Sequence, residues 1–251
     1  MKINLLLKGT DVLVFDINDW YILRNHYRII GELIGNSNHI PVLPLKLLPE
    51  EVEFLLGKKI AKLVYFKAEQ NYEDDYESNL LEEQILLYKN NRRKQLENMV
   101  DKIVASKRKR GDLRTESEIL DDELEKSCQV NGSNMIWPIS LMPHKLICEE
   151  IDHITYQHTN HLRCAVFQNL WERGYYITSG QKFGGDFLVY LGDPIIYHAI
   201  FIVRCVDNML SMDSHEIVAF GRLGTSVKKK TVLASLINEQ VSFITLNWID
   251  D

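Results

Sequence analysis

The sequence predicts a mixed α/β (α+β) protein made of a small N-terminal α+β domain, a long charged helical segment and a C-terminal domain with a mixed central sheet. Three observations predict this class. Short apolar runs of strand length alternate with helical patterns at both ends of the chain, a long charged stretch without proline separates them, and 45% of the 251 residues are apolar, enough for a buried core. We expect a first domain at residues 1–66, a connecting segment at 67–139 and a second domain at 140–251.

The N-terminal domain is predicted from short strands and capped helices. The run DVLVFDI is typical of a strand, and INDWYILRNHY has helical apolar spacing after Asp16 or Asn18 as a cap. Pro49 followed by Glu50 and Glu51 indicates the start of a second helix, because proline suits a first helical turn and acids favour the positive end of the helix dipole. The run IAKLVYF predicts a closing strand.

The connecting segment is predicted to be a charged, weakly amphipathic helix or pair of helices, and we favour a solvated linker. Its apolar residues at helical spacing are Leu81, Ile85, Tyr88, Leu96, Met99 and Ile103. The stretch TESEILDDELEKSCQVNGSN that follows has the acidic composition of a mobile region.

The C-terminal domain is expected to begin with the helix HLRCAVFQNLWERG, which ends at Gly174. The run GGDFLVYLGDPIIYHAIFI then predicts a hairpin with a tight turn at LGDP, Tyr190 closing its first strand and His198 just inside its second. Beyond a short helix capped by Asp213 or Ser214, we expect a glycine-containing loop, GRLG, before the lysine triplet. The last run, QVSFITLNWIDD, is apolar on both faces, so at a sheet edge it is expected to pair with another chain.

The composition excludes some functions. A net charge of −6 argues against a free-standing, nonspecific nucleic-acid binder, and it leaves open an RNA substrate that is held jointly with partners. No stretch approaches eighteen uninterrupted apolar residues, so no transmembrane helix is predicted. Asp11 and Asp16 closely follow the first apolar run, which argues against a signal peptide.

Tyr190, His198 and the lysines at 228–230 are candidates for acid–base chemistry, although each type of residue is more often structural. A phenol, an imidazole and an ammonium are sufficient to cleave RNA without a metal ion, because the RNA supplies its own 2′-hydroxyl nucleophile. An imidazole, with an ordinary pKa of about 6.5, suits the general acid, and a lysine suits charge stabilisation. Ionising an ordinary phenol at pH 7 costs about 4 kcal/mol, so tyrosine as a base requires either concerted proton transfer or a lysine that lowers its pKa.

Metal and nucleotide sites are not predicted. No (D/E)xK follows the GDP of Asp193, and HExxH and GxxxxGK[ST] are absent. His153, His158 and His161 form a possible metal cluster, but their spacing matches no standard site and a polar linker is favoured. We therefore expect no metal ion and no small-molecule cofactor.

The ordered motifs LWERGYYITSGQKFGGDFLVYLGDPIIYHA, GRLGTSVKKK and LNW resemble the tRNA-splicing endonuclease family, in particular its eukaryotic catalytic subunit that cuts the 3′ splice site. The resemblance covers residues 161–251, and LVFDI with PLKLLPEEVEFL extends it more loosely to the N-terminus. It implies a restriction-endonuclease-like nuclease fold for the C-terminal domain. Residues 67–150 carry no such resemblance.

The resemblance also implies roles for individual residues. Tyr190 would be the general base, His198 the general acid and Lys229 the group that stabilises the transition state. Arg222 and Trp248 would grip a bulge nucleotide by sandwiching its base, in the service of the opposite catalytic subunit.

Two details of the match remain open. Lys228 and Lys230 flank Lys229, which leaves the register of the catalytic lysine undecided. The family's YPGDP reads YLGDP here, with Leu191 in place of a proline that would stiffen the turn.

The function implied is cleavage of pre-tRNA at the 3′ splice site, giving a 2′,3′-cyclic phosphate and a 5′-hydroxyl. The implied partners are a second catalytic subunit and two structural subunits, with no DNA and no small-molecule cofactor, in the nucleus or on an organelle surface. The alternative is a non-catalytic structural or assembly subunit of the same type of complex. A third, weaker interpretation is a chain that only docks RNA through KRKR and the long helix.

Overall fold

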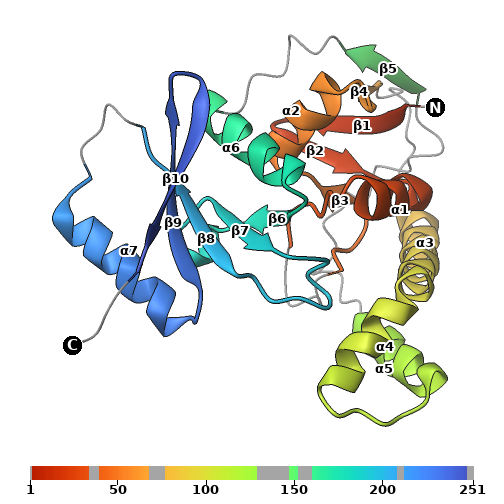
Figure 1. Ribbon diagram of the computed structural model, residues 1–251. Helices are drawn as coiled ribbons and strands as arrows, with labels where there is room; N and C mark the ends of the chain where they lie inside the picture. Colours follow the sequence, from red (N-terminus) through yellow and green to blue (C-terminus); the bar gives the residue numbers. More distant parts are fainter. Residues whose placement is uncertain are drawn as a thin grey trace.

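The computed structural model describes residues 2–33, 40–67, 77–128, 147–151, 160–207 and 212–247 (Figure 1). The helices are α1 (Ile17–His26), α2 (Pro49–Gly57), α3 (Glu77–Asn98), α4 (Val100–Lys109), α5 (Glu116–Cys128), α6 (His161–Glu172) and α7 (Ser214–Ser226). The strands are β1 (Ile3–Lys8), β2 (Asp11–Val14), β3 (Leu45–Lys46), β4 (Ala61–Lys67), β5 (Ile147–Ile151), β6 (Tyr176–Ser179), β7 (Phe187–Tyr190), β8 (Phe201–Cys205), β9 (Lys230–Ile237) and β10 (Gln240–Leu246). The mixed α/β class is confirmed.

The N-terminal sheet has the strand order β3-β2-β1-β4-β5, with β1 and β4 parallel and the other pairs antiparallel. Its last strand corrects the expected domain boundary at residue 140. β5 lies in the range assigned to the second domain, yet it pairs with β4 through Leu63 opposite Ile151 and Lys67 opposite Ile147. The chain therefore returns from the connecting helices to cover the open edge of β4 before it enters the second sheet.

The C-terminal sheet is mixed, as expected, with the order β10-β9-β8-β7-β6. β8 and β9 run parallel, while the other neighbours are antiparallel. A parallel pair needs a crossover connection, and α7 is the helix that lies between β8 and β9 in the chain and covers β9 (Figure 1). β10 is the last strand on that side, so among the described residues it is an edge strand whose outer side pairs with no other strand.

Capping and proline chemistry place the helices much as the sequence predicts. Asp16 caps α1, because its carboxylate accepts hydrogen bonds from the backbone N–H groups of Asn18 at 2.8 Å and Asp19 at 3.0 Å. Pro49 is the first residue of α2. None of the helices in the described part of the chain combines the length and the apolar character that crossing a bilayer requires.

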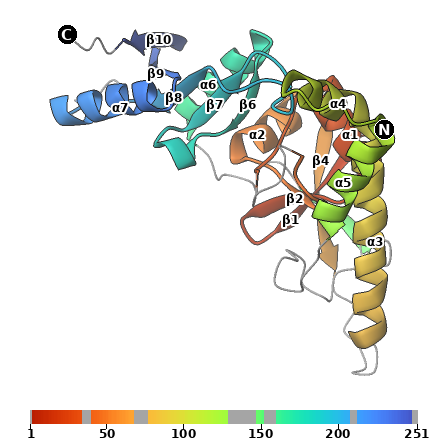
Figure 2. The same ribbon diagram turned by 90° about the horizontal axis from the view of Figure 1, so that it is seen from below.

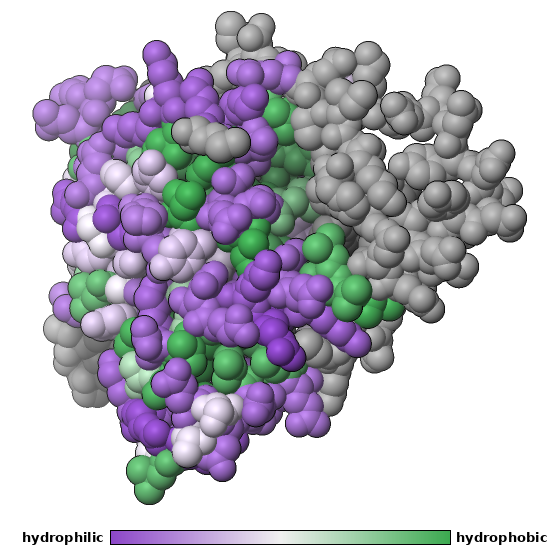
Figure 3. Space-filling view, turned by 90° about the vertical axis from the view of Figure 1, so that its right-hand side faces the viewer, coloured by the Kyte–Doolittle hydropathy of each residue, from purple (hydrophilic) through white to green (hydrophobic). Residues whose placement is uncertain are grey.

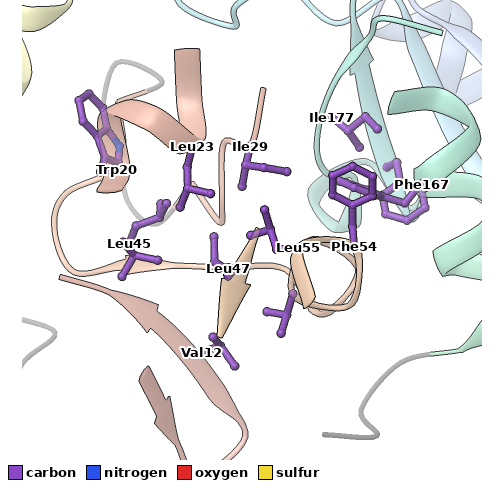
Figure 4. Packing of buried hydrophobic residues seen from close by; sticks show 14 of the residues in the cluster. Val12, Trp20, Leu23, Ile29, Leu45, Leu47, Phe54, Leu55, Phe167 and Ile177 are labelled. Carbon is purple, nitrogen blue, oxygen red and sulfur yellow. The ribbon is translucent and has the colours of Figure 1, made fainter. Parts of the chain in front are cut away.

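The two domains share one apolar core, which α2 and α6 close between the sheets (Figure 4). The ring of Phe54 on α2 contacts two rings of α6: its centroid lies 6.1 Å from that of Phe167, in an edge-on arrangement, and 4.5 Å from that of Trp171. Ile177 of β6 belongs to the same cluster. The contact between domains is therefore a packed aromatic interface, which stabilises the association of the two domains.

The connecting segment is not the solvated linker that we expected. Its helix α3 lies beside α1 of the N-terminal domain in both views, and α4 and α5 pack against the end of α3 and against each other (Figures 1 and 2). Leu96, Met99 and Ile103 are buried in the common core, as is Ile119 of α5. Residues 116–128, expected to be mobile, form α5.

Polar contacts add to this packing. The Arg92 guanidinium donates to the carbonyl oxygen of Ile40 at 3.1 Å, and the Gln95 side-chain amide donates to that of Pro41 at 3.0 Å. The outer surface on this side is mostly hydrophilic, with apolar residues in separate small patches (Figure 3).

Two local predictions in the C-terminal domain are wrong. The connection between β7 and β8 is a long loop rather than a tight turn, so His198 lies before the second strand and not within it. GRLG lies inside α7 and not in a loop, because Gly221 and Gly224 are buried where the helix packs closely on β9.

Candidate active site

The register of the C-terminal sheet brings three segments to one edge. Val189 of β7 lies opposite Phe201 of β8, and Phe201 lies beside Lys230 of β9. Because β7 is antiparallel to β8 and β8 is parallel to β9, the end of β7 meets the starts of β8 and β9. Tyr190, His198 and Lys229 occupy these three ends.

All three side chains line one pocket of about 330 Å³. This volume lies at the lower end of the range of roughly 300–1,000 Å³ that is usual for ligand sites. The pocket thus joins a phenol, an imidazole and an ammonium around a space that suits a phosphodiester and its neighbouring groups. Its full lining is Glu32, Leu33, Thr178, Ser179, Gln181, Lys182, Phe183, Leu188, Tyr190, Tyr197, His198, Ala199 and Lys229.

Tyr190 is the most buried of the three, with 4% of its surface exposed. Its hydroxyl and that of Thr178 on β6 share a hydrogen bond at 3.3 Å. Burial raises the pKa of the Tyr190 phenol, and the hydrogen bond with Thr178 offsets only part of that effect. The phenol is therefore held in its protonated form at neutral pH. Of the two ways in which a tyrosine could act as a base, concerted proton transfer remains, because only burial and Thr178 act on the pKa of Tyr190 and no lysine lowers it.

His198 is exposed at the pocket wall, in the loop that leads from β7 to β8. The loop is anchored on both sides of it. Asp193 accepts backbone hydrogen bonds from Ile196 at 2.9 Å and Tyr197 at 3.0 Å, and the Ile200 N–H donates to Val189 of β7 at 2.8 Å. His198 thus owes its position to its neighbours in the loop.

Lys229 precedes β9 and is half-buried. Its ammonium donates to the carbonyl oxygen of Val227 at 3.2 Å and lies 5.3 Å from the centre of the Phe183 ring. Gly224 of α7 makes the lysine's position possible, because a Cβ there would lie 2.8 Å from the Lys229 carbonyl oxygen. An ammonium has three N–H donors, so the contact with Val227 uses one of them.

The neighbouring lysines differ in position. Lys228 and Lys230 are exposed and line an adjacent pocket of about 710 Å³, which also includes His198 and Lys229 but not Tyr190. Within the triplet, only Lys229 borders the pocket that holds both Tyr190 and His198. The lysine of the implied register is therefore the one that shares this pocket with the phenol and the imidazole.

The pocket also contains side chains that the sequence did not point to. Glu32 and Leu33 come from the N-terminal domain, and the Glu32 carboxylate pairs with Lys46 at 3.2 Å. Gln181 and Lys182 come from the turn between β6 and β7. Lys182 directly precedes the FGGDF run of the resemblance, and this position is a signal that could have pointed to it. No local pattern relates residue 32 to residue 190, so Glu32 could not have been found in this way.

The remaining candidates are separate from the pocket or lie outside the described residues. Arg222 is exposed on α7 and does not line the pocket. Trp248, His153 and His158 fall outside the residues that the structure describes, and His161 is the first residue of α6. Within the described ranges, no three His, Cys, Asp or Glu side chains gather as metal ligands would.

Comparison with known proteins finds matches to both ends of the chain. The model of the tRNA intron endonuclease catalytic C-terminal domain matches residues 160–243, and that of the TSEN34-like N-terminal domain matches residues 3–66. The first range contains β6–β9, whose ends carry the pocket, and so defines a nuclease domain. Each of the two domains therefore matches a model from the tRNA-splicing endonuclease family.

Individual relatives cover different shares of the chain. The human tRNA-splicing endonuclease subunit Sen34 is 43% identical over 88 residues, which are 35% of this chain and 28% of that protein. The probable subunit sen34 of Schizosaccharomyces pombe is 26% identical over 245 residues, with 86% of this chain and 81% of that protein covered. The tRNA-splicing endonuclease of Sulfurisphaera tokodaii is 37% identical over 87 residues, 34% of this chain and 48% of that protein. The match thus spans less than a third of the human relative's length.

Proposed function

We propose that this chain is the catalytic subunit that cleaves pre-tRNA at the 3′ splice site, by attack of the 2′-hydroxyl and without a metal ion. One observation carries the proposal: Tyr190, His198 and Lys229, which the resemblance assigns to base, acid and charge stabilisation, line a single pocket. The expected products are a 2′,3′-cyclic phosphate and a 5′-hydroxyl.

The reaction requires three groups on the protein: a base, an acid and a group that stabilises negative charge. The reaction takes a proton from the 2′-hydroxyl, forms a bond between that oxygen and phosphorus, and breaks the bond to the 5′ oxygen. His198, exposed to the pocket, supplies the proton to the departing 5′ oxygen. The Lys229 ammonium lies at the same edge and stabilises the charge on the phosphorane oxygens.

Tyr190 acts as a base without being ionised beforehand. Its pKa lies above the ordinary value because the phenol is buried, and even an ordinary phenol costs about 4 kcal/mol to ionise at pH 7. The phenol therefore passes its own proton on, toward Thr178 or solvent, while it accepts the proton of the attacking hydroxyl. Tyr190→Phe removes this relay and is expected to lower kcat strongly.

The decisive experiment uses the chain assembled with the other subunits and a pre-tRNA substrate in EDTA. His198→Ala should abolish the 3′ cut and leave the 5′ cut, while His215→Ala, which changes an exposed histidine on α7, serves as the matched control. End-group analysis should find the cyclic phosphate and the 5′-hydroxyl. An unchanged 3′ cut in His198→Ala, or a reaction that EDTA stops, contradicts the proposal.

The lysine register has its own test. Lys229→Ala should lower kcat at the 3′ site by on the order of 10²-fold or more, as for the loss of one donor to a developing oxyanion. Lys228→Ala and Lys230→Ala are matched controls in the same triplet and should change kcat much less. Equal losses in all three variants would mean that the triplet acts only through its total charge.

The structural-subunit alternative predicts the opposite pattern. If the chain only supports assembly, Tyr190→Phe leaves both cuts intact, whereas changes in β10 disrupt the complex. Exposed Ile244, with 58% of its surface accessible, supports a role for β10 in assembly under either proposal. We therefore propose that β10 contacts another subunit of a complex with a second catalytic subunit and two structural subunits.

Two further expectations complete the proposal. Arg222 and Trp248 are proposed to sandwich a bulge base for the opposite catalytic subunit, so Arg222→Ala should slow the 5′ cut more than the 3′ cut. We propose a nuclear location, which imaging of a tagged chain tests directly against an organelle surface.

A further inference from the structure

Asp193, in the GDP motif, lies at a junction of three parts of the chain. Its carboxylate accepts hydrogen bonds from Arg24 of α1 at 2.7 and 3.1 Å and from the Lys102 ammonium of α4 at 2.9 Å. It also accepts the backbone N–H of Ile195 at 3.0 Å. The N-terminal domain, the connecting helices and the loop that carries His198 therefore meet on one carboxylate.

The contact is buried. The Arg24 and Asp193 side chains are 1% and 4% exposed, and Lys102 is 28% exposed. Burial acts to raise the pKa of the Asp193 carboxyl, but the hydrogen bonds and charges of Arg24 and Lys102 outweigh it and hold that pKa below its ordinary value. A buried carboxylate with this many donors is fixed in position, since each displacement breaks a charge-assisted hydrogen bond.

The loop transmits that position to His198. The Asp193 carbonyl oxygen accepts hydrogen bonds from Ile196 and Tyr197, the residue next to His198. The Tyr197 ring packs so closely on Gly192 that a Cβ there would lie 2.5 Å from it, and the Lys109 ammonium of α4 lies 5.1 Å from its centre. Both ends of α4 thus contact the loop, Lys102 at Asp193 and Lys109 at Tyr197.

We propose that Arg24 and Lys102 are positioning residues for the proposed cleavage reaction: through Asp193 they hold the loop at 191–200 so that His198 faces the pocket. This inference rests on the proposed function, and it assigns a role to the connecting helices, which have no counterpart in the resemblance. These helices complete the active site from outside the nuclease domain. Neither Arg24 nor Lys102 lines the pocket itself.

Lys102→Met tests the proposal because it removes the ammonium and keeps most of the aliphatic length, at a partly exposed side chain. The matched control is Lys126→Met, which removes an exposed lysine paired with Asp122 in the same helical segment. Lys102→Arg is the conservative variant and should restore most of the activity. Thermal unfolding and size-exclusion chromatography of the assembled complex verify folding and assembly for each variant.

The kinetic readout separates positioning of the acid from general damage. A general acid contributes on the order of 10²–10⁴-fold, so Lys102→Met should lower kcat at the 3′ site by about 10- to 100-fold, with KM nearly unchanged. A substrate with a 5′-bridging sulfur at that site should recover most of the loss, because a thiol, with a pKa of about 8.5, leaves without needing an acid.

Each outcome has a definite meaning. Wild-type kcat in Lys102→Met, equal losses with the oxygen and sulfur substrates, or an equal loss in Lys126→Met overturns the positioning role. If Lys102→Met does not assemble, Asp193→Asn takes its place, since it keeps the side-chain shape, and the same outcomes apply. His198→Ala is measured alongside: if it retains the 3′ cut, the proposed function itself fails, whereas its loss with an unaffected Lys102→Met overturns only the positioning role.

Discussion

Gly224→Ala is the change that most directly tests how the fold sets the position of Lys229, the proposed catalytic lysine. Gly224 lies in the last turn of α7, where its carbonyl oxygen accepts the Lys229 N–H at 2.9 Å. A Cβ at this position would lie 2.8 Å from the Lys229 carbonyl oxygen and 2.7 Å from the Thr231 methyl group. Because ordinary contacts between carbon atoms are about 3.5–4.0 Å, α7 and the lysine turn must separate by roughly 1 Å.

Two effects on stability compete, and their sizes decide the sign. Alanine favours a helix over glycine by up to about 1 kcal/mol, less near a helix end. Overpacking of a close contact costs about 1–3 kcal/mol. We therefore expect Gly224→Ala to lower the free energy of unfolding by about 1 kcal/mol or more. The separation also moves the Lys229 ammonium, and a misplacement of 1 Å costs on the order of 10²-fold in rate.

Urea unfolding of the chain and single-turnover cleavage by the assembled complex measure both effects. Gly57→Ala is the matched control, since Gly57 is also the end of a helix, α2, and nothing lies within 4 Å of an added Cβ there. It should keep or slightly raise stability, with wild-type cleavage. If Gly224→Ala is as stable as the wild type and cleaves as fast, the close approach of α7 does not determine the position of the lysine.

Three further predictions concern the frame around the pocket. Phe54→Ala removes the ring that contacts α6 and should cost about 3–5 kcal/mol in urea unfolding, whereas a loss below 1 kcal/mol would show that the domains do not depend on this interface. Leu96→Ala should cost about 2–5 kcal/mol if α3 is part of the core, and Leu86→Ala, at a side chain that is 60% exposed, is the control and should change little. The pKa of Asp193 is lowered in the folded protein, so its carboxylate stabilises the fold above the unfolded pKa of about 3.9 and loses this effect as the pH falls through the folded pKa. Asp193→Asn should remove this part of the acid dependence of the melting temperature between pH 6 and pH 2. An unchanged dependence of the melting temperature on pH would contradict the assignment.

Much of the fold was predictable from local chemistry. Asp16 and Pro49 mark the starts of α1 and α2, because a capping carboxylate and a first-turn proline act within a few residues of their own position. The GRLG error has the same origin. Glycine is a local signal for a loop, but Gly224 is required by packing on β9, which no local pattern shows.

The long-range features had no local signal. Leu96, Met99 and Ile103 have helical spacing, but the spacing does not say whether the apolar face meets a core or solvent, and here the N-terminal domain covers it. β5 joins the first sheet across the whole helical segment. Likewise, the GDP motif makes Asp193 noticeable in the sequence, but no local pattern shows that Arg24 and Lys102 pair with it.

The pocket depends on topology more than on the contacts of its three central residues. Tyr190, His198 and Lys229 lie at the end of β7 and just before β8 and β9, and only the antiparallel β7–β8 and parallel β8–β9 pairings bring these points together. Had β9 run antiparallel to β8, its start would lie at the opposite edge of the sheet, and Lys229 with it. The helix α7 makes the parallel pairing possible, and Gly224 then lets it approach the lysine turn closely. The same helix therefore determines the direction of β9 and, to within about 1 Å, the position of Lys229. This is why a single methyl group added at Gly224 is expected to lower the rate of cleavage.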